Sequence, residues 1–180
     1  FLMALVNVDL WAAKRASSDD GTAGVYAAAS MLARALFFVF RAFGDALFPA
    51  VSAALARGDG SDARRLSRRG LAQLGCLILP ACGCATGAAQ VVLETIFGAA
   101  EWGAGAVYMG WLAPSSVLWV FTAVFAAMIA AAARPGRAAV LLALVLVLEV
   151  VLVFRWAAAS GPQGAAMGSL VAAAAGCAVV

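Results

Sequence analysis

The sequence predicts an all-α integral membrane protein, a bundle of about six transmembrane helices. Of its 180 residues, 66% are hydrophobic and only 12% are charged, whereas a soluble domain has about 45–50% apolar and about 25% charged residues. The apolar residues also come in blocks of roughly twenty, the length at which a helix crosses the hydrocarbon core. Strands of a membrane barrel would instead be about ten residues of strict alternation, a pattern that these blocks exceed in length.

Charge clusters and turn dipeptides divide the chain into six expected spans, at residues 1–13, 24–48, 71–93, 104–133, 138–159 and 164–180. The chain opens and closes inside apolar stretches, so we expect the first and last spans to be parts of longer helices. Residues 1–180 are therefore predicted to form a single helical lobe of a longer protein.

The predicted breaks have turn chemistry of their own. The segment 134–137 reads Arg-Pro-Gly-Arg, and Gly161-Pro162 precedes the last span; proline removes a backbone donor and glycine frees the backbone. Pro80 and Pro114 lie inside spans, where neighbouring helices or water must satisfy the freed carbonyls. Each of these prolines forms either a static kink or a hinge that moves.

The loops carry unequal numbers of basic residues. If the spans alternate in direction, one side collects seven (Arg57, Arg64, Arg65, Arg68, Arg69, Arg134 and Arg137) and the other collects three (Lys14, Arg15 and Arg155). By the positive-inside rule, the side with seven is cytoplasmic. We expect the basic segment 57–70 to be an amphipathic helix at the inner membrane surface, near anionic headgroups. It either sets the topology or also meets an anionic substrate.

Three charged residues inside the second span are the most informative feature. Arg34, Arg41 and Asp45 follow one another at intervals of seven and four, so they share a helix face with Tyr26 and Ser30. An arginine at mid-bilayer costs about 2.5–3.5 kcal/mol on the most lenient scale, so this face should meet a bundle interior or a wet cavity. The five residues are the predicted substrate-binding or cavity residues.

The roles within this stripe differ. Arg34 has no acid one turn away, and its planar fork suits phosphate, so we expect it to contact the ligand. Arg41 with Asp45 is either a second contact or only an internal ion pair. Glu149 is alone in an apolar run, so it is protonated, paired with an arginine of another helix, or a proton or cation site. Asp9 is assigned no role beyond the membrane interface.

The sequence contains none of the common motifs of soluble enzymes or metal sites. There is no histidine, and Cys82-Gly-Cys84 has no second cysteine pair to complete a zinc site. No P-loop, Gly-x-Ser-x-Gly or paired acidic motif is present. We therefore expect no enzyme activity, no cofactor, no metal and no nucleic-acid partner.

The order of several short motifs resembles a known family. Asn7-Val8-Asp9, the run from Gly24 to Ala29, and Ala46 to Ser52 are followed by Leu93 to Gly98, the 135–137 turn and Gly161 to Ala166. This succession resembles the polysaccharide flippases of the multidrug, oligosaccharidyl-lipid and polysaccharide exporter superfamily, which also holds the lipid II flippases. The resemblance spans nearly the whole chain.

The resemblance implies a carboxy-terminal lobe of six helices, which works with an amino-terminal lobe of the same protein by alternating access. It implies a multi-pass protein of the bacterial plasma membrane that moves an undecaprenyl-pyrophosphate-linked oligosaccharide for cell-surface polysaccharide biosynthesis, with an anionic lipid-linked glycan and membrane lipids as partners. The alternatives are a cation-coupled multidrug exporter, with Glu149 or Asp45 as coupling site, a lipid II flippase, and a docking module of an export complex.

Overall fold

The chain forms a bundle of helices, as predicted, and is an all-α membrane protein. The computed structural model describes residues 2–17, 19–98, 100–132 and 135–179. Their elements are α1 (Leu2–Leu5), α2 (Val8–Ala16), α3 (Asp20–Ala56), α4 (Gly60–Gly87), α5 (Ala89–Phe97), the 3₁₀ helix η1 (Ala100–Gly105), α6 (Ala106–Ala131) and α7 (Pro135–Val179). Among these described residues, four helices are long and apolar enough to cross a membrane: α3, α4, α6 and α7.

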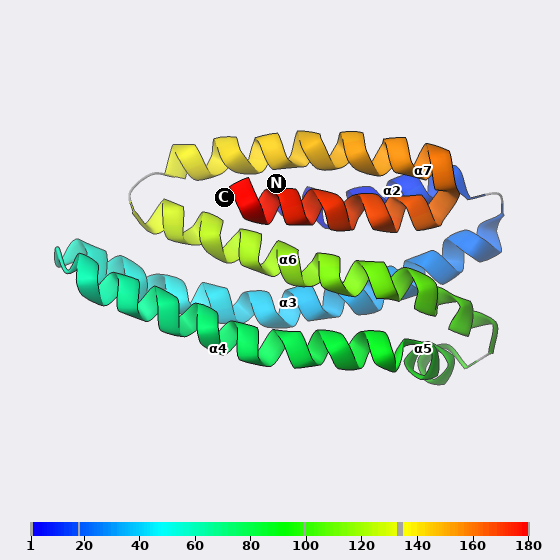
Figure 1. Ribbon diagram of the computed structural model, residues 1–180, viewed down its shortest axis with the longest axis horizontal. Coiled ribbons are helices and arrows are strands. Elements are labelled where there is room, and N and C mark those ends of the chain that lie inside the picture. Colours follow the sequence, from blue (N-terminus) through cyan, green and yellow to red (C-terminus); the bar gives the residue numbers. More distant parts are fainter. Residues whose placement is uncertain (1, 18, 99, 133–134, 180) are drawn as a thin grey trace.

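Helix α7 contains both of the last two predicted spans. Ser160 and Gly161 leave the helical conformation, and Gly161 has a φ of +64° and a ψ of −150°, a region that only glycine adopts readily. Figure 1 shows the consequence: the chain reverses there, and the red second arm of α7 runs back beside the first. The break predicted at Gly161-Pro162 is therefore present, and α7 is a helical hairpin.

Helix α4 differs from the sequence prediction. The basic segment 57–70 was expected to lie as a separate helix at the membrane surface, and the span 71–93 to follow it. Instead, Gly60–Gly87 is one helix, and the remainder of the predicted span forms the short α5 after a break at Ala88. Pro80 lies within α4 and Pro114 within α6, and neither ends its helix.

The first predicted span is also divided. Residues 6 and 7 form a turn between α1 and α2, and the side-chain amide of Asn7 donates to the Met3 carbonyl at 2.6 Å. The second predicted span, 24–48, is extended at both ends into the 37-residue α3. Residues 133 and 134 lie outside the described residues, so the structure does not describe Arg134, the first residue of the predicted 134–137 turn, and α7 begins at Pro135.

Small residues let the helices of the bundle approach closely. Gly168 of the second arm of α7 lies against the backbone of Leu152 and Val153 in the first arm, and Gly176 lies against the Val145 side chain. Between membrane helices the hydrophobic effect does not drive association, so the close van der Waals packing that small residues allow stabilises the contact instead. Gly44 of α3 packs on Val124 of α6 in the same way.

Helices α3 and α6 are parallel and in register. Gly105 lies against Val25, and Gly44 against Val124, so both contacts join residues that are 80 apart in the chain. In Figure 1 the α3–α4 turn and the α6–α7 turn lie at one end of the bundle, and the α2–α3 turn and the α7 reversal at the other. The described basic residues thus divide between the two ends as the sequence predicted.

Candidate polar site in the membrane bundle

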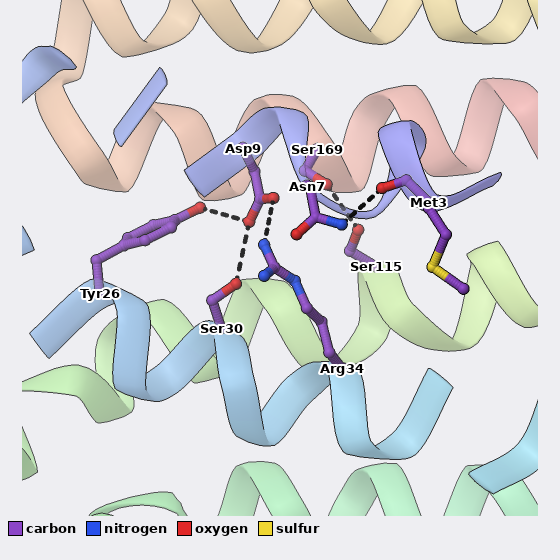
Figure 2. Close-up of polar contacts among 8 residues, drawn as sticks. All are labelled: Met3, Asn7, Asp9, Tyr26, Ser30, Arg34, Ser115 and Ser169. Carbon is purple, nitrogen blue, oxygen red and sulfur yellow. Dashed lines mark hydrogen bonds and ion pairs between the residues drawn. The ribbon is translucent and has the colours of Figure 1, made fainter. Parts of the chain in front are cut away.

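A cluster of four polar side chains joins α2 to α3 in the interior, and we call it the Asp9 cluster (Asp9, Tyr26, Ser30 and Arg34). Figure 2 shows the three α3 side chains converging on one carboxylate. The Tyr26 hydroxyl donates to Asp9 Oδ2 at 2.9 Å, and the Ser30 hydroxyl lies 3.5 Å from the same oxygen. Arg34 Nη2 donates to Asp9 Oδ1 at 3.1 Å and forms an ion pair with it.

The spacing of the α3 residues explains this convergence. Tyr26, Ser30 and Arg34 occupy successive turns of one helix face, because residues four apart lie one above the other. Asp9 enters from the short α2 that packs along this face. Its side chain is 5% exposed and that of Arg34 is 15% exposed, so the two charges neutralise each other away from solvent, as buried charges must.

The cluster leaves very little free space. A small cavity of about 10 Å³ adjoins it, lined by Asp9, Ser30, Arg34 and hydroxyls of α6 and α7. A cavity of this size has room for about one water molecule. In this conformation Arg34 therefore faces an aspartate rather than an open ligand cavity. Its predicted contact with a substrate remains a prediction.

Asp9 is the residue that sequence reasoning missed. The acid that neutralises Arg34 is 25 positions away on a different helix, so helical spacing within α3 does not reveal it. A signal was nevertheless present, because an acid inside an apolar stretch needs a partner in the bundle. Asp9 was the only acid in its predicted span.

Glu149 lies in the first arm of α7. The residue is fully buried, and neither carboxyl oxygen has a hydrogen-bond partner among the described residues. The neighbouring Ser169 hydroxyl is engaged with that of Ser115 at 3.0 Å. Of the three expectations for Glu149, an ion pair with Arg34 or Arg41 is therefore not formed in this conformation.

Arg41 and Asp45 form the second charged pair of α3. Arg41 Nε lies 3.4 Å from Asp45 Oδ2, and their side chains are 28% and 60% exposed. The register of 80 places Arg41 level with Phe121 and Asp45 level with Phe125, within the 26-residue α6. The stripe on α3 is thus divided: α2 covers its first half, whereas in the second half Arg41 is partly exposed and Asp45 mostly exposed.

Among the described residues, no group of three or more His, Cys, Asp or Glu side chains lies close enough to hold a metal ion. The four cysteines are free thiols. The charged and hydroxyl groups on α2, α3, α6 and α7 are therefore the chemistry that the bundle offers. They suit binding and proton exchange inside a membrane.

The fold and these buried charges define the chain as a polytopic all-α membrane protein. No family model, curated protein or solved structure matches it. The resemblance to polysaccharide flippases therefore rests on the motifs in the sequence.

Proposed function

We propose that the chain is one lobe of a membrane transporter that moves an anionic lipid-linked oligosaccharide from the inner to the outer leaflet of the bacterial plasma membrane by alternating access. A second lobe of the same protein would complete the pathway. The observation that supports this proposal is the Arg41–Asp45 pair, in which Asp45 is mostly and Arg41 partly exposed, at the level of the second half of α6.

A charged pair in this position does not fit lipid. Placing one arginine in the hydrocarbon costs about 2.5–3.5 kcal/mol or more, so such groups face protein or water. The described residues leave Asp45 mostly exposed, so water or further protein has to cover it. A water-filled pathway between two lobes meets this requirement.

The surroundings of the pair suit an amphiphilic anion. Phe38 and Phe48 lie one turn or less from the pair along α3 and are 47% and 39% exposed. Arg41 bonds Asp45 through Nε alone, so the two terminal nitrogens of its guanidinium retain donors for a phosphate. Arg41 replaces Arg34 as the residue expected to hold the pyrophosphate, because Arg34 is engaged with Asp9.

The test is translocation of a fluorescent undecaprenyl-pyrophosphate-linked oligosaccharide in proteoliposomes of the full-length protein, read as loss of the glycan to added glycosidase. Arg41→Gln removes a charge-assisted hydrogen bond worth about 1.5–3 kcal/mol, so the rate at low substrate should fall about 10- to 100-fold. Asp45→Asn should have the opposite effect and increase the affinity for the substrate, because it removes the carboxylate that competes with the phosphate for Arg41.

Arg155→Gln is the matched control, since it removes one exposed arginine of α7 at the other end of the bundle. Its rate should stay within about twofold of wild type. Equal losses in Arg41→Gln and Asp45→Asn would mean that the pair serves only the fold, and the proposed binding role would be wrong. The same assay with lipid II distinguishes a lipid II flippase.

A second candidate is a cation-coupled multidrug exporter, and the buried Glu149 with two unpartnered carboxyl oxygens favours it. A carboxyl without partners in a membrane is suited to carry a proton. Glu149→Gln should then abolish uptake of a cationic dye driven by a pH gradient, whereas Glu94→Gln, an acid of α5 bonded to Gln90, should not. If Glu149→Gln still translocated the glycolipid, with no dependence on the pH gradient, this candidate would be rejected.

A further inference from the structure

The basic end of the α3–α4 hairpin borders a groove that lies outside the polar site. The groove has a volume of about 520 Å³, within the range of small-ligand sites. Val51 and Leu55 of α3, Leu71 of α4 and Met128 of α6 form its apolar walls, and Arg64, Ser67 and Arg68 of α4 form its polar rim.

The polarity of the groove follows the axis of the bundle. Gly70 packs on Leu47, and Ala63 clusters with Ala54, so α4 runs antiparallel to α3. This register places Arg68 close to the level of the last turn of α6 and Arg64 beyond it. In Figure 1 the α3–α4 hairpin protrudes past the end of α6 at this end. The arginines thus lie where headgroups begin; Leu71 and Met128 lie deeper than both, and Val51 and Leu55 lie at about the level of the arginines.

The arginines of the rim are available for an anion. Asp62, the acid of the same helical turn, pairs with Arg57 at 3.8 Å and with Arg65 at 2.8 Å. Among the described residues, Arg64 and Arg68 form no ion pair, and both are exposed. They are one helical turn apart, so two guanidinium groups can converge on one phosphate.

We propose that this groove binds an anionic phospholipid of the cytoplasmic leaflet, with its phosphodiester between Arg64 and Arg68, its glycerol region against Val51, and the upper part of one acyl chain against Leu71 and Met128. Charge complementarity selects the headgroup, and the level of the groove in the membrane selects a lipid over a soluble anion. The bound lipid fills the junction of α3, α4 and α6 and holds the basic hairpin at the membrane surface.

The experiment is native mass spectrometry of the full-length protein from micelles containing equal amounts of phosphatidylglycerol and phosphatidylcholine. The wild type should retain phosphatidylglycerol in preference. Each arginine near an anionic headgroup contributes about fivefold, so the double variant Arg64→Gln/Arg68→Gln should lose about 30-fold of this preference.

Arg65→Gln/Arg69→Gln is the control, because it removes the same formal charge from the same helix but from residues that do not line the groove. All four arginines border a second hollow on α4, and Arg65 also pairs with Asp62, so the comparison tests the groove itself. It should retain the preference within about threefold. Equal losses in the two double variants would show a diffuse basic surface and overturn the site. Soluble glycerol phosphate serves as the headgroup alone. If it displaced the lipid at equal concentration, the apolar walls would contribute nothing, and the proposal would again fail.

Discussion

Removing one member of the Asp9–Arg34 pair is expected to destabilise the bundle far more than removing both. The pair is nearly buried, and Asp9 also accepts from Tyr26. Breaking a buried ion pair from one side typically costs about 3–5 kcal/mol, because it leaves an uncompensated charge, whereas replacing both partners is often close to neutral. The structure therefore predicts a coupling free energy of about 3 kcal/mol between the two side chains.

The two single variants should not be equivalent. Asp9→Asn keeps an acceptor for the Tyr26 hydroxyl but strands the Arg34 guanidinium, which cannot lose its proton in a protein. Arg34→Met strands a carboxylate, which can become neutral by binding a proton. Asp9→Asn should consequently be the more damaging change, and the cost of Arg34→Met should fall as the pH is lowered.

The assay is a double-mutant cycle on the free energy of unfolding of the full-length protein in mixed micelles, with wild type, both single variants and Asp9→Asn/Arg34→Met. Arg41→Met supplies the comparison with a more exposed ion pair, for which at most about 1 kcal/mol is expected. Additive single effects, giving a coupling free energy near zero, would refute the buried ion pair as the contact that joins α2 to α3.

Three further predictions concern other parts of the bundle. Gly168→Leu would press a side chain into the backbone of the first arm of α7 and should cost about 1–3 kcal/mol of unfolding free energy, whereas Gly110→Ala, which faces open space, should be neutral or stabilising in the same denaturation experiment. Hydrogen bonds from the backbone and a serine hydroxyl hold the pKa of the Asp59 carboxyl, the N-cap of α4, below its usual 3.8. The stabilisation of α4 by this cap is therefore complete above pH 3.8 and is lost as the pH falls through the lower pKa of the folded state. Faster amide exchange in the first turn of α4 would report this loss, and the Asp59→Asn variant should show no such change. A cysteine at Phe38 should react with a membrane-impermeant thiol reagent on a cysteine-free background and one at Ser30 should not, so equal protection at both would contradict a wet α3 face.

The lengths of the apolar blocks sufficed to predict the fold class, because a hydrocarbon core sets both the composition and the length of any helix that crosses it. The break at Gly161-Pro162 could also be predicted, because a glycine followed by a proline is a strong local signal for a turn. The continuous α4 was not. Its arginines read as a separate surface helix, but a helix that protrudes beyond its neighbours can carry the same charges without a break.

The division of the α3 stripe was beyond any reading of the sequence. Helical spacing correctly placed Arg34, Arg41 and Asp45 on one face of one helix, but their environments depend on what covers that face. Helix α2 and Asp9 cover it at Arg34, whereas Asp45 is mostly exposed. Periodicity within a helix reports which residues share a face, and only packing between helices reports what each residue meets there.

The charges along the spans also constrain the transport cycle that the proposed function would require. Apart from Arg155 near a helix end, the six spans predicted from the sequence carry two arginines, two aspartates and Glu149, so the charges within them balance when Glu149 is protonated. An anionic substrate that took Arg41 would release Asp45 and add negative charge to this balance. Each binding event would then require a compensating positive charge, either a proton on one of the carboxylates or an arginine of a second lobe. Under the proposed function, substrate binding is therefore expected to be coupled to the charge state of α3 and α7, and the Arg41→Gln and Glu149→Gln variants separate the two contributions.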